Sequence, residues 1–169
     1  MTATQKRQVT KTKGKQYVVF LLGETQFGVE IDQVLRIIRL TPITRIPRAP
    51  SFLEGVINYR GQAIPVVDLN KRLALAGEKE YGYKARILIV NLEAQSIGML
   101  VDAVTEIVRL PDESIEPAPE MAAQVNGVYL EGIAHYRNRL LVLLDLERVL
   151  TIEDVDELDK WQTESEHDQ

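Results

Sequence analysis

FGVEIDQVLRIIRL, at residues 27–40, recurs seventy residues later as IGMLVDAVTEIVRL at residues 97–110, and this repeat decides the fold. The copies share glycine, aspartate, valine, isoleucine, arginine and leucine at matching positions. A second stretch, LEGVINYRGQAIPVVDL at residues 53–69, recurs as LEGIAHYRNRLLVLLDL at residues 130–146. The offset rises from 70 to 77, and the seven added residues fall within the loop-like segment 111–128. Two blocks in the same order predict two homologous halves.

Each half is rich in short apolar segments of the β type. In the first half these segments are Tyr17–Leu22, Phe27–Ile31, Val34–Leu40, Gly55–Tyr59 and Ala63–Val67. The last two are joined by YRGQ at residues 59–62, and the second half has YRNR at residues 136–139. Because glycine and asparagine adopt positive φ more easily than other residues, Gly61 and Asn138 predict a tight hairpin in each half.

Two further positions predict local structure at the strand ends. Asp68 and Asp145 are repeat counterparts, and each is expected to cap a short helix, over residues 69–75 and 146–150 respectively. Pro65 cannot donate a ladder hydrogen bond, so its strand is expected to lie at a sheet edge or to carry a bulge. The pair Asp32 and Asp102 is interpreted as capping strand ends or turns.

Five short strands in each half, with little helix, predict an all-β fold of two small homologous barrels that share a core, since closure removes exposed strand edges. The first barrel is expected at about residues 15–82 and the second at about 83–150. Residues 1–14 form a flexible basic arm in this prediction, and residues 151–169 form an acidic C-terminal helix and tail. Thr151 and Asp154 resemble a capping box at the start of that helix.

The composition excludes several kinds of chemistry. The chain has no cysteine, so disulfides, thiolate metal sites and cysteine nucleophiles are absent. No glycine-rich phosphate loop, HExxH helix or GxSxG turn occurs. His135 corresponds to Asn58 in the repeat, which indicates a polar hairpin site and not a general base. We therefore expect a protein that is not an enzyme and has no cofactor.

The charge and hydropathy patterns indicate location and exclude other partners. The net charge is −5, with a basic N-terminal segment, an acidic C-terminal segment and a balanced body. Small barrels and basic arms can bind nucleic acid, but a balanced body with scattered aromatic residues argues against a nucleic-acid interface. The longest apolar runs are far shorter than the roughly 20 residues of a membrane-spanning helix, and residues 1–15 lack the apolar core of a secretory signal. A cytoplasmic protein without direct membrane insertion is expected.

Because no catalytic motif was found, we expect the protein to function through surfaces that bind other proteins. Charged residues interrupt apolar strands at Arg36, Arg39 and Arg60, and apolar residues occur in loops at Ile43, Ile46 and Met121. The alternative interpretation is that the arginine stems cover apolar surface and the loop aliphatics belong to the core.

The order of these segments resembles a known family. The runs are YVVFLLG at 17–23, FGVEI at 27–31, ITRIPRAP at 43–50, FLEGVINYRG at 52–61, IPVVDL at 64–69, GMLVD at 98–102 and PAPE at 117–120. Together they are similar to the signature segments of the CheW-like domain family, over about residues 15–150. The resemblance implies two five-stranded SH3-like barrels and no cofactor. It also implies a scaffold that couples the cytoplasmic tips of methyl-accepting chemoreceptors to the histidine kinase CheA.

Such a scaffold would be cytoplasmic and recruited to membrane receptor arrays. The alternative function is the same scaffold role in a different receptor–kinase pathway, such as pilus motility or development.

The resemblance also implies two sets of contact residues. The receptor tip would lie against the junction of the barrels, at Val34, Arg36, Arg60, Val101 and Val104. The kinase would contact loop tips at Ile43, Arg45, Ile46 and Met121.

Two positions depart from the family pattern. Arg36 occupies a position that is commonly glutamate, where the acid can pair with the arginine matching Arg60. Either a receptor carboxylate compensates these cations, or Glu106 or Glu30 does so within the chain. Met121 occupies a loop position where phenylalanine can anchor a second kinase contact, and its flexible side chain can fill a similar pocket.

Overall fold

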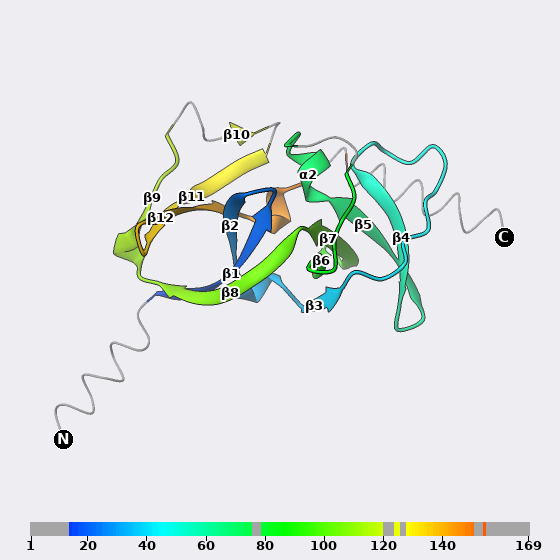
Figure 1. The fold of residues 1–169 in the computed structure, drawn as a ribbon, viewed down its shortest axis with the longest axis horizontal. Helices are drawn as coiled ribbons and strands as arrows, with labels where there is room; N and C mark the ends of the chain where they lie inside the picture. The colour runs from blue at the N-terminus through cyan, green and yellow to red at the C-terminus, as the bar shows by residue number, and fades with distance from the viewer. Residues whose placement is uncertain (1–13, 76–78, 120–123, 126–127, 151–153, 155–169) are drawn as a thin grey trace, which may run out of the picture.

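The computed structural model describes residues 14–75, 79–119, 124–125, 128–150 and 154, and these residues form two β-sheets with short helical turns (Figure 1). The first sheet has the order β10-β11-β12-β2-β1-β8, with β9 paired to β11. Its strands are β1 (Lys15–Leu22), β2 (Thr25–Glu30), β8 (Ala103–Leu110), β9 (Ile115–Glu116), β10 (Gln124–Val125), β11 (Val128–Tyr136) and β12 (Arg139–Leu144).

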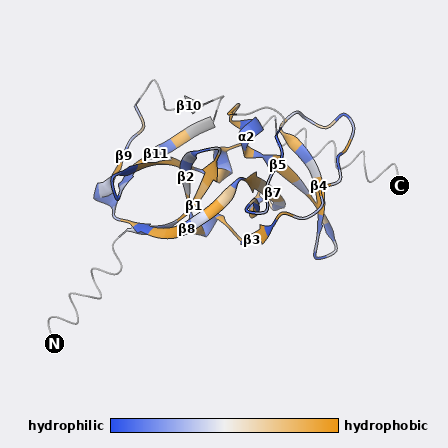
Figure 2. Cartoon of the chain, viewed as in Figure 1, coloured by the Kyte–Doolittle hydropathy of each residue, from blue (hydrophilic) through white to orange (hydrophobic). Residues whose placement is uncertain are grey.

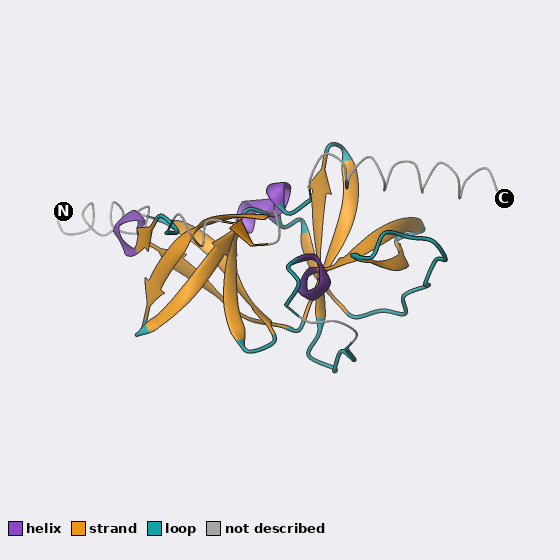
Figure 3. Ribbon diagram, turned by 90° about the horizontal axis from the view of Figure 1, so that it is seen from above, coloured by secondary structure: helices purple, strands orange, loops and turns teal. Residues whose placement is uncertain are grey.

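The second sheet has the order β3-β6-β7-β5-β4. Its strands are β3 (Arg36–Arg39), β4 (Leu53–Tyr59), β5 (Gln62–Asp68), β6 (Arg86–Leu92) and β7 (Gln95–Val101). The short helices are η1 (Ile31–Gln33), α2 (Leu69–Arg72), η2 (Asp112–Ser114) and η4 (Leu146–Arg148). Figure 3 shows the strands gathered into two lobes joined near the middle of the molecule.

The sheets do not follow the boundary expected between residues 82 and 83. The β1–β2 hairpin from the first half lies between β8 and β12 of the second half. The β6–β7 hairpin from the second half lies between β3 and β5 of the first half. Each half therefore contributes a hairpin to the other half's sheet, so the two sheets do not coincide with the predicted segments 15–82 and 83–150.

The strand register confirms the internal repeat. β5 and β7 are parallel with Val66 opposite Gly98, and their repeat counterparts β12 and β2 are parallel with Leu143 opposite Gly28. Likewise, β3 places Arg36 opposite Ile89, and β8 places Glu106 opposite Val19. Because the same positions are paired in both halves, a contact in one half can be compared residue by residue with its counterpart.

Both predicted hairpins are present. In the first, Arg60 and Gly61 have φ values of 52° and 81°, and in the second Arg137 and Asn138 have φ values of 48° and 61°. Two consecutive residues with positive φ produce the turn twist that matches paired strands.

Both predicted caps are also present, but the helices are shorter than expected. Asp68 accepts a hydrogen bond from the Lys71 backbone N–H at 3.3 Å, and Asp145 accepts one from Glu147 N–H at 3.0 Å. The helices end at Arg72 and Arg148.

The edge prediction for Pro65 was wrong, because β5 lies between β4 and β7. Its pairing with β7 begins only at Val66, so Pro65 lies before the parallel ladder, and the register shift is in the neighbouring strand β4.

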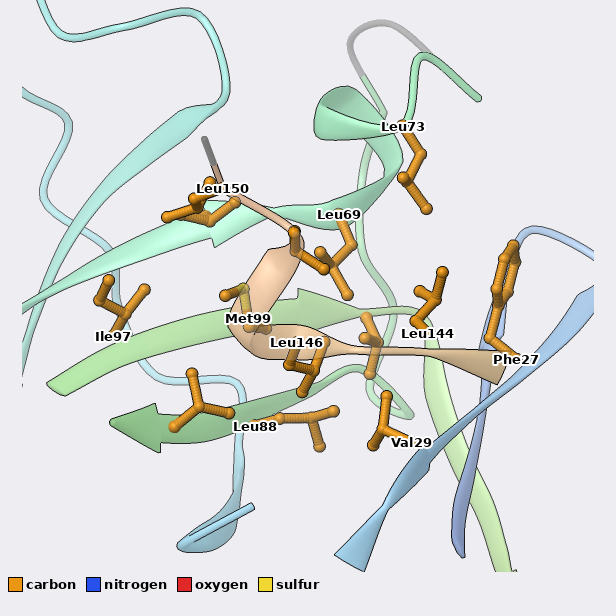
Figure 4. Close-up of a cluster of buried hydrophobic side chains, with 14 of the residues drawn as sticks. Phe27, Val29, Leu69, Leu73, Leu88, Ile97, Met99, Leu144, Leu146 and Leu150 are labelled. Atoms are coloured by element: carbon orange, nitrogen blue, oxygen red, sulfur yellow. The ribbon is translucent and has the colours of Figure 1, made fainter. Parts of the chain in front are cut away.

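Three apolar clusters stabilise the structure. The largest takes residues from both sheets and includes Phe27 and Leu144 from the first, Met99 from the second, and Leu69 and Leu146 from the capped helices (Figure 4). A smaller cluster lies in each sheet, around Leu141 in the first and Ile87 in the second. Burying each large aliphatic side chain contributes about 1.5–3 kcal/mol, so the shared cluster joins the two sheets strongly.

The predicted C-terminal helix lies outside the described residues apart from Asp154, which pairs with Arg72 at 3.3 Å. Within the described ranges, no helix has the length and apolar character needed to cross a membrane.

Candidate interaction surfaces

The loop after β3 contains three of the predicted kinase-binding residues, and β4 holds it in place. Thr44 N–H donates to the Val56 carbonyl at 2.8 Å, and Val56 N–H donates back at 2.9 Å. Gly55 has a φ of 155°, and a Cβ atom there would collide with the Thr44 carbonyl oxygen. This glycine therefore allows the loop to cross β4 closely.

The three loop residues differ in exposure. Ile43 packs against the apolar cluster of the second sheet, so its side chain serves the core as well as the loop. Ile46 is half-buried. Arg45 is exposed, and its guanidinium pairs with Glu54 Oε1 at 3.1 Å. Met121 lies outside the described residues, so the second predicted kinase contact has no structural account here.

Glu54 and Lys71 support this loop and were not identified from the sequence. Glu54 Oε2 pairs with Lys71 Nζ at 3.1 Å while its other oxygen pairs with Arg45. Both side chains are largely buried. Glu54 is the repeat counterpart of Glu131, and that repetition was the only sequence signal for a charged residue at this position.

The three predicted receptor-binding valines meet at the junction of the two sheets. Val101 is fully buried in the shared cluster, and Val34 and Val104 are half-buried against it. Because Val101 has no accessible surface, it can act only by supporting its neighbours. Leu35 lies beside Val34 and is 60% exposed, which adds an accessible apolar side chain that sequence reasoning missed.

Arg36 and Arg60 are both exposed, and neither forms an ion pair with any other described residue. Arg60 lies at the tip of the β4–β5 hairpin, which Figure 2 shows as hydrophilic, and its guanidinium carbon is 5.3 Å from the Tyr59 ring centroid. The acids considered as internal partners are engaged elsewhere: Glu106 pairs with Arg139 at 3.1 Å, and Glu30 pairs with Lys15 at 2.7 Å. Of the two alternatives for Arg36, a pair with Glu106 or Glu30 is therefore not formed among the described residues, and compensation by a receptor carboxylate stays a prediction.

The repeat explains why Arg36 forms no ion pair with another described residue. Glu106 and Arg139 are the counterparts of Arg36 and Gln62. The second half thus has an acid–base pair where the first half has a base and an amide. Arg36 on β3 and Arg60 on the β4–β5 hairpin are exposed, so each guanidinium can donate to a carboxylate of another molecule.

The remaining titratable candidates have structural roles. Asp102 directly follows β7 and accepts a hydrogen bond from Gly23 N–H at 2.8 Å, as expected for a residue at a strand end. Asp32 is exposed in η1. His135 is an exposed hairpin residue whose Nε2 lies 3.3 Å from Glu116. Among the described residues, no group of three or more side chains is arranged to hold a metal ion.

The domain consists of two homologous halves that exchange hairpins and share an apolar core. Its anchored loop and its cationic hairpin are features of a protein-interaction domain. A family model described as the CheW-like domain matches residues 16–154. The chain belongs to the CheW-like domain family, whose members are non-catalytic scaffolds.

Individual relatives cover most of the chain. Chemotaxis protein CheW of Klebsiella aerogenes is 33% identical over 153 residues, which are 90% of this chain and 92% of that protein. Protein FrzA of Myxococcus xanthus is 32% identical over 138 residues, covering 80% and 85%. Scaffolding protein TtCheW from Thermoanaerobacter tengcongensis superposes with a TM-score of 0.75 at 35% identity, covering 83% of this chain and 95% of that structure.

Proposed function

We propose that this chain is a chemotaxis adaptor that couples methyl-accepting chemoreceptors to the histidine kinase CheA. The observation that carries the proposal is the family match across residues 16–154, together with relatives named chemotaxis protein CheW over most of their length. In this proposal each lobe is an SH3-like barrel, although the first sheet has seven strands among the described residues and not the five predicted. The adaptor works in the cytoplasm and is recruited to membrane receptor arrays.

The kinase surface in this proposal is the loop with Ile43, Arg45 and Ile46, with Met121 as part of a second contact. Arg45 is exposed but held by Glu54, so it can contact a partner with little loss of side-chain freedom. Ile46 offers half-exposed apolar surface beside it. An apolar anchor next to a fixed charge is typical of the centre of a specific interface.

The receptor surface is the junction of Val34, Arg36, Arg60, Val101 and Val104. Leu35 provides exposed apolar area there, and Arg36 and Arg60, which form no ion pair among the described residues, provide positive charge. The complementary receptor segment would carry an apolar residue beside a carboxylate. Fully buried Val101 contributes by shaping this surface from below.

A crossed pair of variants tests the proposal. Ile46→Asp places a charge in the kinase surface and should abolish co-elution with the CheA regulatory domain while leaving receptor binding unchanged. Leu35→Asp should abolish receptor binding while leaving co-elution with the CheA regulatory domain unchanged. Tyr83→Asp is the matched control, because Tyr83 is 88% exposed and lies on neither surface. The assignment of surfaces would be overturned if either folded variant lost binding to both partners. It would also be overturned if both variants kept binding to both partners.

The relative named FrzA favours a second candidate, the same scaffold role in a different receptor–kinase pathway such as pilus motility or development. Binding measured against the receptors and kinases of each pathway in the source organism separates the two candidates. Preference for a chemotaxis kinase supports the first, and preference for another kinase supports the second.

A further inference from the structure

A buried polar cluster lies between the two surfaces and has no role in the function proposed so far. Asp68 and Asn70 are both buried at the start of α2. The Tyr81 hydroxyl, from the segment that joins the two halves, donates to Asp68 Oδ1 at 2.6 Å and accepts from Asn70 Nδ2 at 3.1 Å. Burial and the bond to Asp68 raise the pKa of Tyr81, so its hydroxyl keeps its proton at neutral pH.

On one side, the cluster reaches the receptor surface. Asn70 Nδ2 also donates to Asp102 Oδ2 at 2.9 Å, so its two amide hydrogens serve two different acceptors. Lys79 Nζ pairs with Asp102 Oδ1 at 2.6 Å. Burial alone would raise the pKa of Asp102, but the bonds from Lys79, Gly23 N–H and Asn70 outweigh it and lower that pKa. Asp102 follows Val101 directly in the chain, at the junction of the sheets.

On the other side, the cluster reaches the kinase surface. Asp68 Oδ1 accepts from the Lys71 backbone N–H, and Lys71 Nζ pairs with Glu54. Glu54 in turn pairs with Arg45. A series of hydrogen bonds and ion pairs, continued by the Lys71 side chain between its backbone N–H and its Nζ, therefore joins Asp102 to Arg45.

We propose that Tyr81 is a positioning residue that couples the two binding surfaces, so that a receptor bound at the junction changes the affinity of the Arg45 loop for the kinase. This inference rests on the proposed function. Its hydroxyl bonds both to Asp68, on the loop side, and to Asn70, which bonds Asp102 on the junction side. A buried network leaves little room to move one member without disturbing the others, because an unsatisfied buried group is costly. The coupling is reciprocal by thermodynamic necessity.

The test compares Tyr81→Phe with Tyr83→Phe. The first removes only the bridging hydroxyl, and the second removes an exposed hydroxyl two residues away. The Kd for the CheA regulatory domain is measured with and without a saturating cytoplasmic receptor fragment, using full-length chains. In the unaltered chain and in Tyr83→Phe, the receptor should change the kinase Kd by about fivefold or more. In Tyr81→Phe the ratio of the kinase Kd without receptor to the kinase Kd with receptor should fall to near one. The Kd of this variant without receptor should stay within about twofold of that of the unaltered chain.

The outcomes are distinguishable. If the unaltered chain binds neither partner, the proposed function fails and not this inference alone. If it binds both partners but the ratio is one, or if Tyr81→Phe keeps the full ratio, the coupling role is overturned. Should Tyr81→Phe lose cooperative melting, Lys79→Gln is used instead, since it removes the ion pair of the partly buried Asp102 at the junction end of the network. A full ratio in Lys79→Gln then overturns the inference.

Discussion

Exchanging Arg36 for glutamate and Gln62 for arginine would rebuild in the first half the ion pair that the second half contains. In that natural pair, Arg139 Nη2 lies 3.1 Å from Glu106 Oε2, and the side chains are 40% and 31% exposed. An exposed pair of this kind contributes about 0.2–1 kcal/mol. For a chain of this size the expected rise in Tm is at most about 4 °C relative to the single variants.

A double-mutant cycle measures this directly. Urea unfolding of the unaltered chain, Arg36→Glu, Gln62→Arg and the double variant gives the coupling free energy between the two positions. We expect a favourable coupling of about 0.2–1 kcal/mol, which disappears in high salt. A coupling of zero at low salt would refute the equivalence of the two hairpin surfaces that the repeat and register imply.

The same variants report on the receptor. Arg36→Glu should leave stability nearly unchanged, because Arg36 makes no ion pair among the described residues. It should weaken receptor binding by at least about tenfold, or about 1.4 kcal/mol, since a receptor carboxylate would then face an acid. A lowered Tm with unchanged receptor binding would instead show that Arg36 has an internal partner.

Three further predictions concern the fold. A fragment ending at Gly82 should lack a cooperative thermal transition, because β1 and β2 lose their partners β8 and β12; melting at the temperature of the full chain would contradict the exchanged sheets. Gly55→Ala should lower the free energy of unfolding by about 1–3 kcal/mol through collision with the Thr44 carbonyl, whereas Gly82→Ala, with open space around it, should change it by less than about 0.5 kcal/mol. Because the pKa of Asp102 is lowered in the folded state, its carboxylate stabilises the fold above about pH 4, and this stabilisation is lost as the pH falls through the folded pKa. Asp102→Asn should therefore be less stable than the unaltered chain at pH 7, and its free energy of unfolding should depend less on pH in acid, as measured by denaturant titrations. An unchanged pH profile would contradict the contacts assigned to Asp102.

Local patterns predicted local structure well. The hairpins at Gly61 and Asn138 and the caps at Asp68 and Asp145 depend on neighbours within a few residues, and all four occur. Strand partners depend on contacts far along the chain, which an apolar pattern does not encode. The exchange of the β1–β2 and β6–β7 hairpins was missed for this reason. The placement of Pro65 failed for the same reason, because its strand was interpreted without its neighbours.

The binding roles of the candidate residues stay predictions, and the structure adds only where these residues lie in the fold. The repeat and the family resemblance located the loop around Arg45 and the junction around Val104, but they could not distinguish buried Val101 from exposed Leu35. Both residues are apolar and lie in apolar segments. The network through Tyr81 gave no sequence signal, because its members come from segments that are distant in the chain and meet only after the sheets have formed.

The central claim is that this chain links a receptor to a kinase, and a three-component retention assay tests it most directly. An immobilised cytoplasmic chemoreceptor fragment is incubated with CheA from the same organism, with and without the chain. We predict that CheA is retained strongly only when the chain is present, and that Ile46→Asp abolishes this retention while the variant itself stays bound to the receptor. Equal retention of CheA with and without the chain would contradict the adaptor function.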